Sequence, residues 1–215
     1  MKRAPHEPDD ELSAAEAERL LLRKLEDEKE SPHEALRELA VYYRTTRQSN
    51  KALACFRQLT AIARDVEEKA QCLLNMGQVM ESRRDYREAA RYYKEGLALE
   101  PRDSVVSYFL NNNLGFSLNT LGDLVTGEIY CRKAIDIDPE RHNAHKNLGI
   151  ALSGQGWYRE AAECFVVATQ HRPSDSRAFS LLTELLETSP ELKAEFGDVA
   201  RLCAEAVEQA RVRIH

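Results

Sequence analysis

The sequence predicts an all-α protein, an α-solenoid in which helical hairpins stack one on the next. The first observation is internal repetition, because five kinds of position recur at shared intervals of 38 and 34 residues. They are Gly77, Gly115 and Gly149; Ala89, Gly127 and Ala161; Tyr93, Cys131 and Phe165; Gly96, Ala134 and Ala168; and Pro101, Pro139 and Pro173. The second is that apolar residues within each copy share one face of a helix, and a second helix follows. One hairpin leaves apolar faces uncovered, so the copies must stack.

Composition is the third observation, and it describes an ordinary folded protein. The chain has 215 residues, of which 43% are hydrophobic and 31% are charged, with only 9 glycines and 7 prolines. A chain of this length buries enough surface to fold without a metal ion or a disulfide. We therefore predict no cofactor.

The repeated residues resemble the tetratricopeptide repeat, whose signature runs Leu-Gly, Ala, aromatic residue, small residue and Pro. The clearest copy, residues 142–175, contains Leu148-Gly149, Ala161, Phe165, Ala168 and Pro173. Residues 108–141 and 70–103 also match, whereas two flanking copies keep fewer of the positions. The resemblance implies a right-handed array of hairpins whose first helices line a concave surface.

The elements follow in order from these copies. Residues 1–10 are predicted to be disordered, and residues 11–30 to form an N-terminal capping helix. The repeats are then placed at 33–66 (degenerate), 70–103, 108–141 and 142–175. Residues 176–215 are expected to hold a fifth, degenerate repeat and a C-terminal capping helix, with Gly197-Asp198 interrupting the last helical stretch.

Helix-capping residues mark several helix starts independently of the repeat signature. Ser31-Pro32-His33-Glu34 combines an N-cap, a proline at the first helical position and a capping-box glutamate. Asp65 and Asp103 are expected to cap the helices that follow short insertions before the second and third copies. Each insertion should lengthen its helix by one turn.

No motif in the sequence predicts catalysis. It has no glycine-rich phosphate loop, no nucleophile elbow and no Cys-x-x-Cys pair. His142 and His145 are three residues apart, but no third metal ligand is spaced to join them. A packed histidine is the better interpretation of His145. We therefore predict that the protein is not an enzyme and holds no metal.

Charge and cysteine usage limit the partners and the compartment. The formal net charge is −6, of which −4 falls in the first 30 residues, so the rest is nearly neutral. Nucleic-acid binding needs clustered Lys and Arg and is not predicted. No apolar run exceeds five residues, which argues against a membrane span or a cleaved signal. Five cysteines in apolar helical patterns favour free thiols and a cytoplasmic location.

Four positions of each first helix, the second, sixth, ninth and thirteenth of the repeat, point away from the hairpin partner. The resemblance places them on the concave wall, where they would contact a bound peptide. With the neighbouring Lys146, the candidate binding residues are Gln71, Asn75 and Gln78; Phe109, Asn113 and Phe116; and Asn143, Asn147 and Ile150.

Asparagine occupies the sixth position in all three strong copies, as Asn75, Asn113 and Asn147. A primary amide both donates and accepts, so a ladder of them can hold a peptide backbone whatever its side chains are. This pattern resembles the asparagine ladder of peptide-binding repeats such as those of O-GlcNAc transferases. The alternative is that asparagine is merely tolerated on an exposed helix.

A charged clamp for a terminal carboxylate, another ligand mode of the family, would need Lys and Arg on consecutive inner faces. Phe109 and Phe116 stand where basic residues would help, so the sequence argues against it.

The predicted function is a non-enzymatic interaction module that binds an extended peptide or protein segment in its concave groove, as an adaptor or co-chaperone. In this interpretation the three asparagines hold the backbone, while Phe109, Phe116 and Ile150 select apolar side chains. Two alternatives stay open. One is a small acidic secretion-type chaperone, and the other is a structural subunit whose groove is occupied by its own terminal helix.

Overall fold

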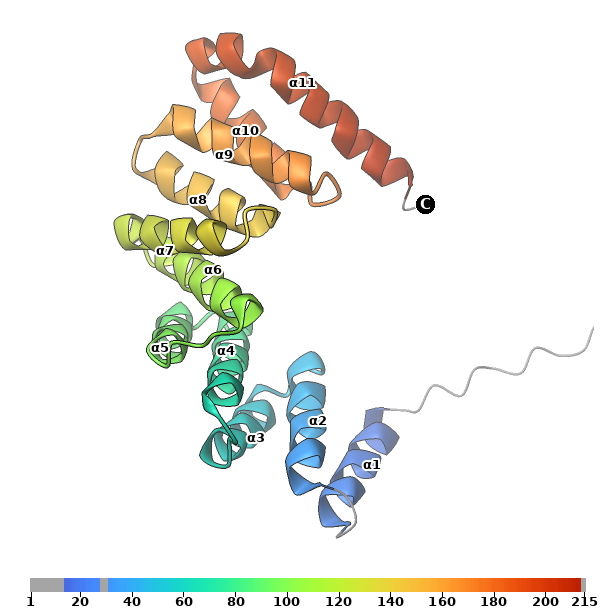
Figure 1. Cartoon of the computed structure of the whole chain (residues 1–215). Coiled ribbons are helices and arrows are strands. Elements are labelled where there is room, and N and C mark those ends of the chain that lie inside the picture. The colour runs from blue at the N-terminus through green and yellow to red at the C-terminus, as the bar shows by residue number, and fades with distance from the viewer. Residues whose placement is uncertain (1–13, 28–30, 214–215) are drawn as a thin grey trace, which may run out of the picture. The chain divides into compact units, whose positions relative to one another are not determined.

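The computed structural model describes residues 14–27 and 31–213, and every regular element in these ranges is an α-helix (Figure 1). The predicted all-α fold of stacked hairpins is confirmed. The helices belong to two compact units, Met1–Ala63 and Arg64–His215. The predicted disordered segment 1–10 lies outside the described residues, as do 11–13 and 28–30 of the predicted capping helix.

The first unit contains α1 (Ala14–Glu26), α2 (Pro32–Thr45) and α3 (Ser49–Ala61). The side chain of Ser31 caps α2 by accepting a hydrogen bond from the backbone nitrogen of Glu34, as predicted. Glu18 ties α1 to the other two helices, because it accepts hydrogen bonds from the Tyr43 hydroxyl at 2.9 Å and from Lys51 Nζ at 2.7 Å.

The second unit continues as a succession of hairpins and carries the candidate site. Its helices are α4 (Val66–Ser82), α5 (Tyr86–Leu97), α6 (Ser104–Thr120), α7 (Leu124–Ile137), α8 (His142–Gly154), α9 (Tyr158–His171), α10 (Arg177–Thr188) and α11 (Pro190–Val212). Each helix packs on its neighbour in sequence, and α6 also packs on both α4 and α8. The first helices of successive hairpins therefore form a row, which runs from α4 in teal to α8 in yellow in Figure 1.

Two aspartates begin helices where the sequence predicted caps. Asp65 accepts a hydrogen bond from the backbone nitrogen of Glu68 at 2.8 Å, and Asp103 accepts from those of Val105 and Val106 at 2.7 and 3.2 Å. Helices α4 and α6 each have 17 residues, against 13 in α8. The insertions therefore lengthen both helices by about one turn.

The two helices of a hairpin approach each other closely where a glycine on one faces an aromatic ring on the other. A Cβ atom added to Gly77 would overlap the ring of Tyr93, and one added to Gly149 would lie 2.5 Å from the ring of Phe165. Both rings are buried. This close approach explains why the glycine and aromatic positions recur in the same register.

The last helix corrects a prediction. Helix α11 runs unbroken from Pro190 to Val212, through Gly197 and Asp198, which were expected to interrupt it. A glycine inside a helix costs only about 1 kcal/mol relative to alanine, which is less than the gain from burying a large side chain such as Phe196. Helix α11 packs on α9 and α10.

All five cysteines are free thiols, and burial raises the pKa of Cys131 to about 12 and that of Cys164 to about 11. Both side chains therefore stay protonated at neutral pH. Within residues 14–27 and 31–213, no helix has the length and hydropathy that crossing a bilayer requires.

Candidate functional site

Three pockets lie on the second unit where successive hairpins meet. The asparagine pocket is lined by Asn112, Asn113, Phe116, Asn143, Lys146, Asn147, Ile150, Arg177 and Leu181. The apolar pocket is lined by Ile150, Ser153, Tyr158, Phe165, Leu181, Glu184, Leu185, Thr188 and Ser189. The arginine pocket is lined by His142, Asn143, Arg172, Ser174, Asp175 and Arg177.

The three pockets share lining residues and therefore lie side by side, and together we call them the first-helix groove. Ile150 and Leu181 belong to both the asparagine and the apolar pockets, and Asn143 and Arg177 belong to both the asparagine and the arginine pockets. The asparagine pocket therefore lies in the middle. It measures about 370 Å³ and the apolar pocket about 480 Å³, which are sizes typical of ligand-binding cavities.

The structure brings six of the ten predicted binding residues together in the asparagine pocket. Every residue that lines this pocket comes from a first helix, α6, α8 or α10. The six predicted residues are Asn113, Phe116, Asn143, Lys146, Asn147 and Ile150.

The other four predicted residues line none of the three pockets. Gln71 is exposed on α4, where Asn75 and Gln78 are half-buried. Phe109 packs instead at the junction of two hairpins, with its ring centroid 5.3 Å from that of Tyr108 and 5.1 Å from the guanidinium carbon of Arg141. These contacts give Phe109 a packing role within the chain.

The asparagines of α6 and α8 bond to one another. Asn147 is buried, and its side-chain nitrogen donates to Oδ1 of Asn112 at 3.0 Å. The backbone oxygen of Asn147 accepts from Nδ2 of Asn119 at 2.8 Å, and Asn112 Nδ2 donates to Asn113 Oδ1 at 2.9 Å. This network fixes the amides of the pocket in place before any ligand binds, which reduces the entropy lost on binding.

Asp175 lies beside two cationic side chains and one imidazole at one end of the groove. Its carboxylate lies 2.8 Å from Arg177 Nε, 3.2 Å from Lys146 Nζ and 3.3 Å from His142 Nε2. Hydrogen bonds from Arg177 hold the pKa of Asp175 well below its usual range. Burial lowers the pKa of Lys146 and of His142, and Asp175 opposes both shifts.

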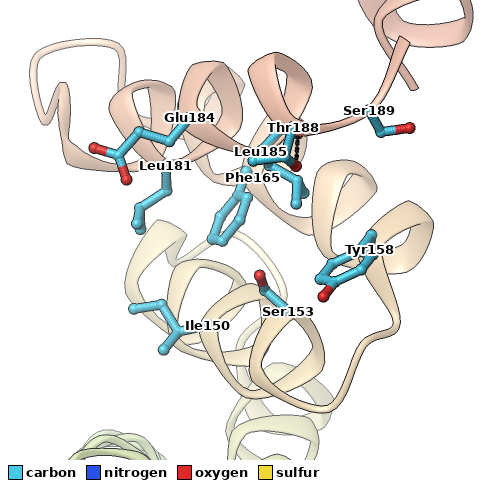
Figure 2. A pocket seen from close by; sticks show the side chains of 9 residues that line it. All are labelled: Ile150, Ser153, Tyr158, Phe165, Leu181, Glu184, Leu185, Thr188 and Ser189. Carbon is cyan, nitrogen blue, oxygen red and sulfur yellow. Dashed lines mark hydrogen bonds between the residues drawn. The ribbon is translucent and has the colours of Figure 1, made fainter. Parts of the chain in front are cut away.

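The apolar pocket continues the groove on the other side (Figure 2). Figure 2 shows Ile150 and Leu181 on one side and Tyr158 on the other, with the ring of Phe165 between them. Phe165 is buried, whereas Tyr158 is 50% exposed. A partly open apolar site of this kind suits an apolar side chain of a partner.

Four further residues that line the groove occupy repeat positions from which the sequence could have predicted them. In the weak fifth copy, which starts at residue 176, the second, sixth, ninth and thirteenth positions are Arg177, Leu181, Glu184 and Thr188. All four line the groove. Asn112 had no such signal, because its position faces the packed side of α6 and only the contact with α8 reveals it.

No group of three or more His, Cys, Asp or Glu side chains in the described part of the chain is placed to hold a metal ion. His145 Nε2 lies 2.7 Å from the backbone oxygen of Pro139, and its ring centroid lies 5.6 Å from that of His171. His145 therefore makes packing contacts of the kind that the sequence predicted.

Comparisons with known proteins agree with this geometry. The family model of the tetratricopeptide repeat matches residues 70–103. Small glutamine-rich tetratricopeptide repeat-containing protein 2 of Mycosarcoma maydis is 30% identical over 141 residues, which are 64% of this chain and 39% of that protein. Human tetratricopeptide repeat protein 7B is 32% identical over 111 residues, 51% of this chain and 13% of that protein. This chain thus spans less than half the length of either relative.

Solved structures share the fold. BtubC (BKLC) from P. vanneervenii superimposes with a TM-score of 0.69 at 16% identity, covering 94% of this chain and 89% of that one. YrrB, described as a TPR protein with an unusual peptide-binding site, gives 0.60 at 18% identity, covering 88% and 91%. The match at residues 70–103 identifies a tetratricopeptide repeat in this chain, and both relatives are tetratricopeptide repeat proteins.

Proposed function

We propose that this chain is a non-enzymatic protein-interaction module of the cytoplasm that binds an extended segment of a partner protein in the first-helix groove, as an adaptor or co-chaperone does. One observation carries the proposal: preorganised amides in the asparagine pocket lie directly beside the apolar pocket. The first can bond a peptide backbone, and the second can take a side chain. The peptide-binding site named for YrrB, which has the same fold, supports this assignment.

In this mechanism Asn113, Asn143 and Asn147 hold the backbone, while Phe116 and Ile150 contact apolar side chains. The three pockets follow α8 and α10 from Asn143 and Arg177 near their starts to Ser153 and Thr188 near their ends. At 1.5 Å per residue this path is about 16 Å long, and an extended chain rises about 3.3 Å per residue, so roughly five residues of the partner fit along it.

The position of α11 favours an open groove over one filled by the C-terminal helix. That helix packs on α9 and α10, and no residue of it lines the asparagine pocket. Its N-cap, Ser189, touches only the rim of the apolar pocket.

Display of random 12-residue peptides on phage, selected against the full chain, tests the proposal. Binding of the selected peptides is then measured by calorimetry to wild type, to Ile150→Gln and to Ile129→Gln. Ile150 lies where two pockets join, whereas Ile129 is 49% exposed and lines none of them. We expect Ile150→Gln to weaken binding at least about tenfold and Ile129→Gln to leave it unchanged, with both variants folded by circular dichroism. Selection of no peptide, or equal binding to both variants, would contradict the proposal.

A further inference from the structure

The charge of the groove is opposite to that of the chain. The arginine and asparagine pockets are lined by three basic side chains, Lys146, Arg172 and Arg177, and by one carboxylate, Asp175. The formal net charge of the whole chain is −6. This end of the groove is therefore a local basic site on an acidic protein, and such a site attracts an anionic group.

Arg177 has unused capacity to bind a carboxylate. Its Nε and Nη2 atoms bond to the two oxygens of Asp175 at 2.8 and 2.9 Å. A guanidinium carries five N–H donors, so donors remain for a second carboxylate. The side chain of Arg177 is 73% exposed, and Arg172 beside it is exposed too. Both guanidinium groups therefore face solvent, where a ligand can reach them.

The other end of the groove has the opposite character. The apolar pocket contains Ile150, Phe165, Leu181 and Leu185, and its one charged side chain is the carboxylate of Glu184. An acidic side chain of a ligand is repelled there and attracted at the arginine pocket. The groove thus fixes which end of the ligand lies where.

The spacing along α10 sets the spacing in the ligand. Arg177, Leu181 and Leu185 are successive turns of one helix face, about 6 Å apart at 1.5 Å per residue. In an extended chain, 6 and 12 Å correspond to about two and four residues. An acidic residue at the arginine pocket therefore places an apolar residue two to four positions away in the apolar pocket.

We infer that the partner segment is an acidic and apolar peptide, in which an internal Asp or Glu side chain binds Arg177 and an apolar side chain two to four residues away fills the apolar pocket. This inference rests on the proposed function and names the ligand class of the same groove. A nucleic acid would satisfy the basic end but would leave the apolar pocket without a matching group.

The sequences of the phage-selected peptides test this inference, together with their binding when they are synthesised with acetylated N-termini and amidated C-termini. We expect Asp or Glu to be enriched over the starting library, two to four positions from Leu, Ile, Val or Phe. In the tightest binder, replacing that acid with Gln should weaken binding about tenfold to wild type but less than about twofold to Arg177→Gln. Arg159→Gln is the matched control, because Arg159 is also exposed and ion-paired, to Glu195, yet lines no part of the groove.

The outcomes separate the two proposals. Peptides that bind at Ile150 without acid enrichment, or whose acid contributes equally with and without Arg177, overturn the inference and leave the proposed function standing. Binding that requires a free C-terminal carboxylate also overturns it. Absence of any binder that depends on Ile150 removes the proposed function and the inference together.

Discussion

Asn147 on α8 donates its side-chain amide to Oδ1 of Asn112 on α6, at 3.0 Å and across 35 positions of sequence. One hydrogen bond thus joins the first helices of two successive hairpins at the floor of the groove. The same asparagine is one of three at the sixth position of a copy, where the sequence suggested a ligand contact. Packing between repeats and preparation of the site therefore depend on one residue.

Replacing Asn147 with Ala should destabilise the free protein by about 1 to 3 kcal/mol, because Oδ1 of the buried Asn112 loses its hydrogen-bond donor. Asn75→Ala is the matched control, since Asn75 has the same repeat position but is half-buried on α4, and we expect a change within about 0.5 kcal/mol. Urea unfolding measures both. Equal losses would mean that the bond to Asn112 contributes nothing specific.

Phe116 lines the asparagine pocket and also meets Tyr86 edge to face, with ring centroids 5.8 Å apart. Because its ring is half-buried, Phe116→Ala should cost about 1 to 2 kcal/mol of stability, which is less than a core substitution. The core control is Phe165→Ala, whose ring is 2% exposed and whose loss should cost about 3 to 5 kcal/mol. Thermal and urea unfolding measure the stability that each variant loses. Equal losses would show that Phe116 is a core residue and does not belong to the proposed site.

Much of the fold was predictable because it repeats. A glycine that faces an aromatic ring within one hairpin depends on residues close in sequence. The spacing of Gly149 and Phe165 therefore predicts a hairpin in each copy that keeps both residue types. The caps Ser31, Asp65 and Asp103 are equally local. The unbroken α11 was not predictable from Gly197, because long-range burial decides whether a helix continues through a glycine.

The site was predictable only in part, for the same reason. Helical periodicity placed ten residues on or beside one predicted face, and six of them line the asparagine pocket, but periodicity treats each helix as isolated. Periodicity therefore did not predict that Asn147 is buried against α6, nor that Phe109 packs on Tyr108 and Arg141. Arg177 and Leu181 occupy the second and sixth positions of the degenerate fifth copy, from which no binding residue was predicted.

Glu81 predicts a pH dependence of stability. It lies at the end of α4 beside Tyr93 and accepts a hydrogen bond from Ser117 Oγ at 3.3 Å, and burial raises the pKa of its carboxyl to about 7. An exposed Glu in the unfolded chain has a pKa near about 4.3. Between about pH 4.3 and pH 7 the folded protein holds a proton that the unfolded chain has released, so the contribution of Glu81 to stability falls as pH rises.

Glu81→Gln removes this ionisation, so its free energy of unfolding relative to wild type should increase from about pH 4.3 and level off above about pH 7, by roughly 3 to 4 kcal/mol. The difference is the quantity to measure, because burial lowers the pKa of His142 and of His145 and gives the opposite slope near the same window. Glu88→Gln is the control, since hydrogen bonds from Arg91 lower the pKa of Glu88 and the difference should have the opposite sign. A flat difference for Glu81→Gln would contradict a buried, titrating carboxyl.

Two glycine substitutions test how the hairpins close. A Cβ atom at Gly149 would lie 2.5 Å from the buried ring of Phe165, and the ring cannot retreat without disturbing the core around it. Gly149→Ala should therefore destabilise the protein by about 1 to 3 kcal/mol, even though alanine is the better helix former. Gly197 is the matched control within α11, where an added Cβ meets nothing within 4 Å.

Gly197→Ala should instead stabilise the protein by about 0.5 to 1 kcal/mol, because alanine loses less conformational entropy in a helix and creates no overlap. Urea unfolding of both variants gives the two signs directly. The double variant Gly149→Ala, Phe165→Leu adds a further check. If overlap with the ring causes the destabilisation, Gly149→Ala should cost less stability in the Phe165→Leu protein, where a smaller side chain faces the new methyl group, than in wild type. Destabilisation by both glycine substitutions would show that helix α11 does not continue through Gly197, and stabilisation by both would show that the hairpin does not need its close contact at Gly149.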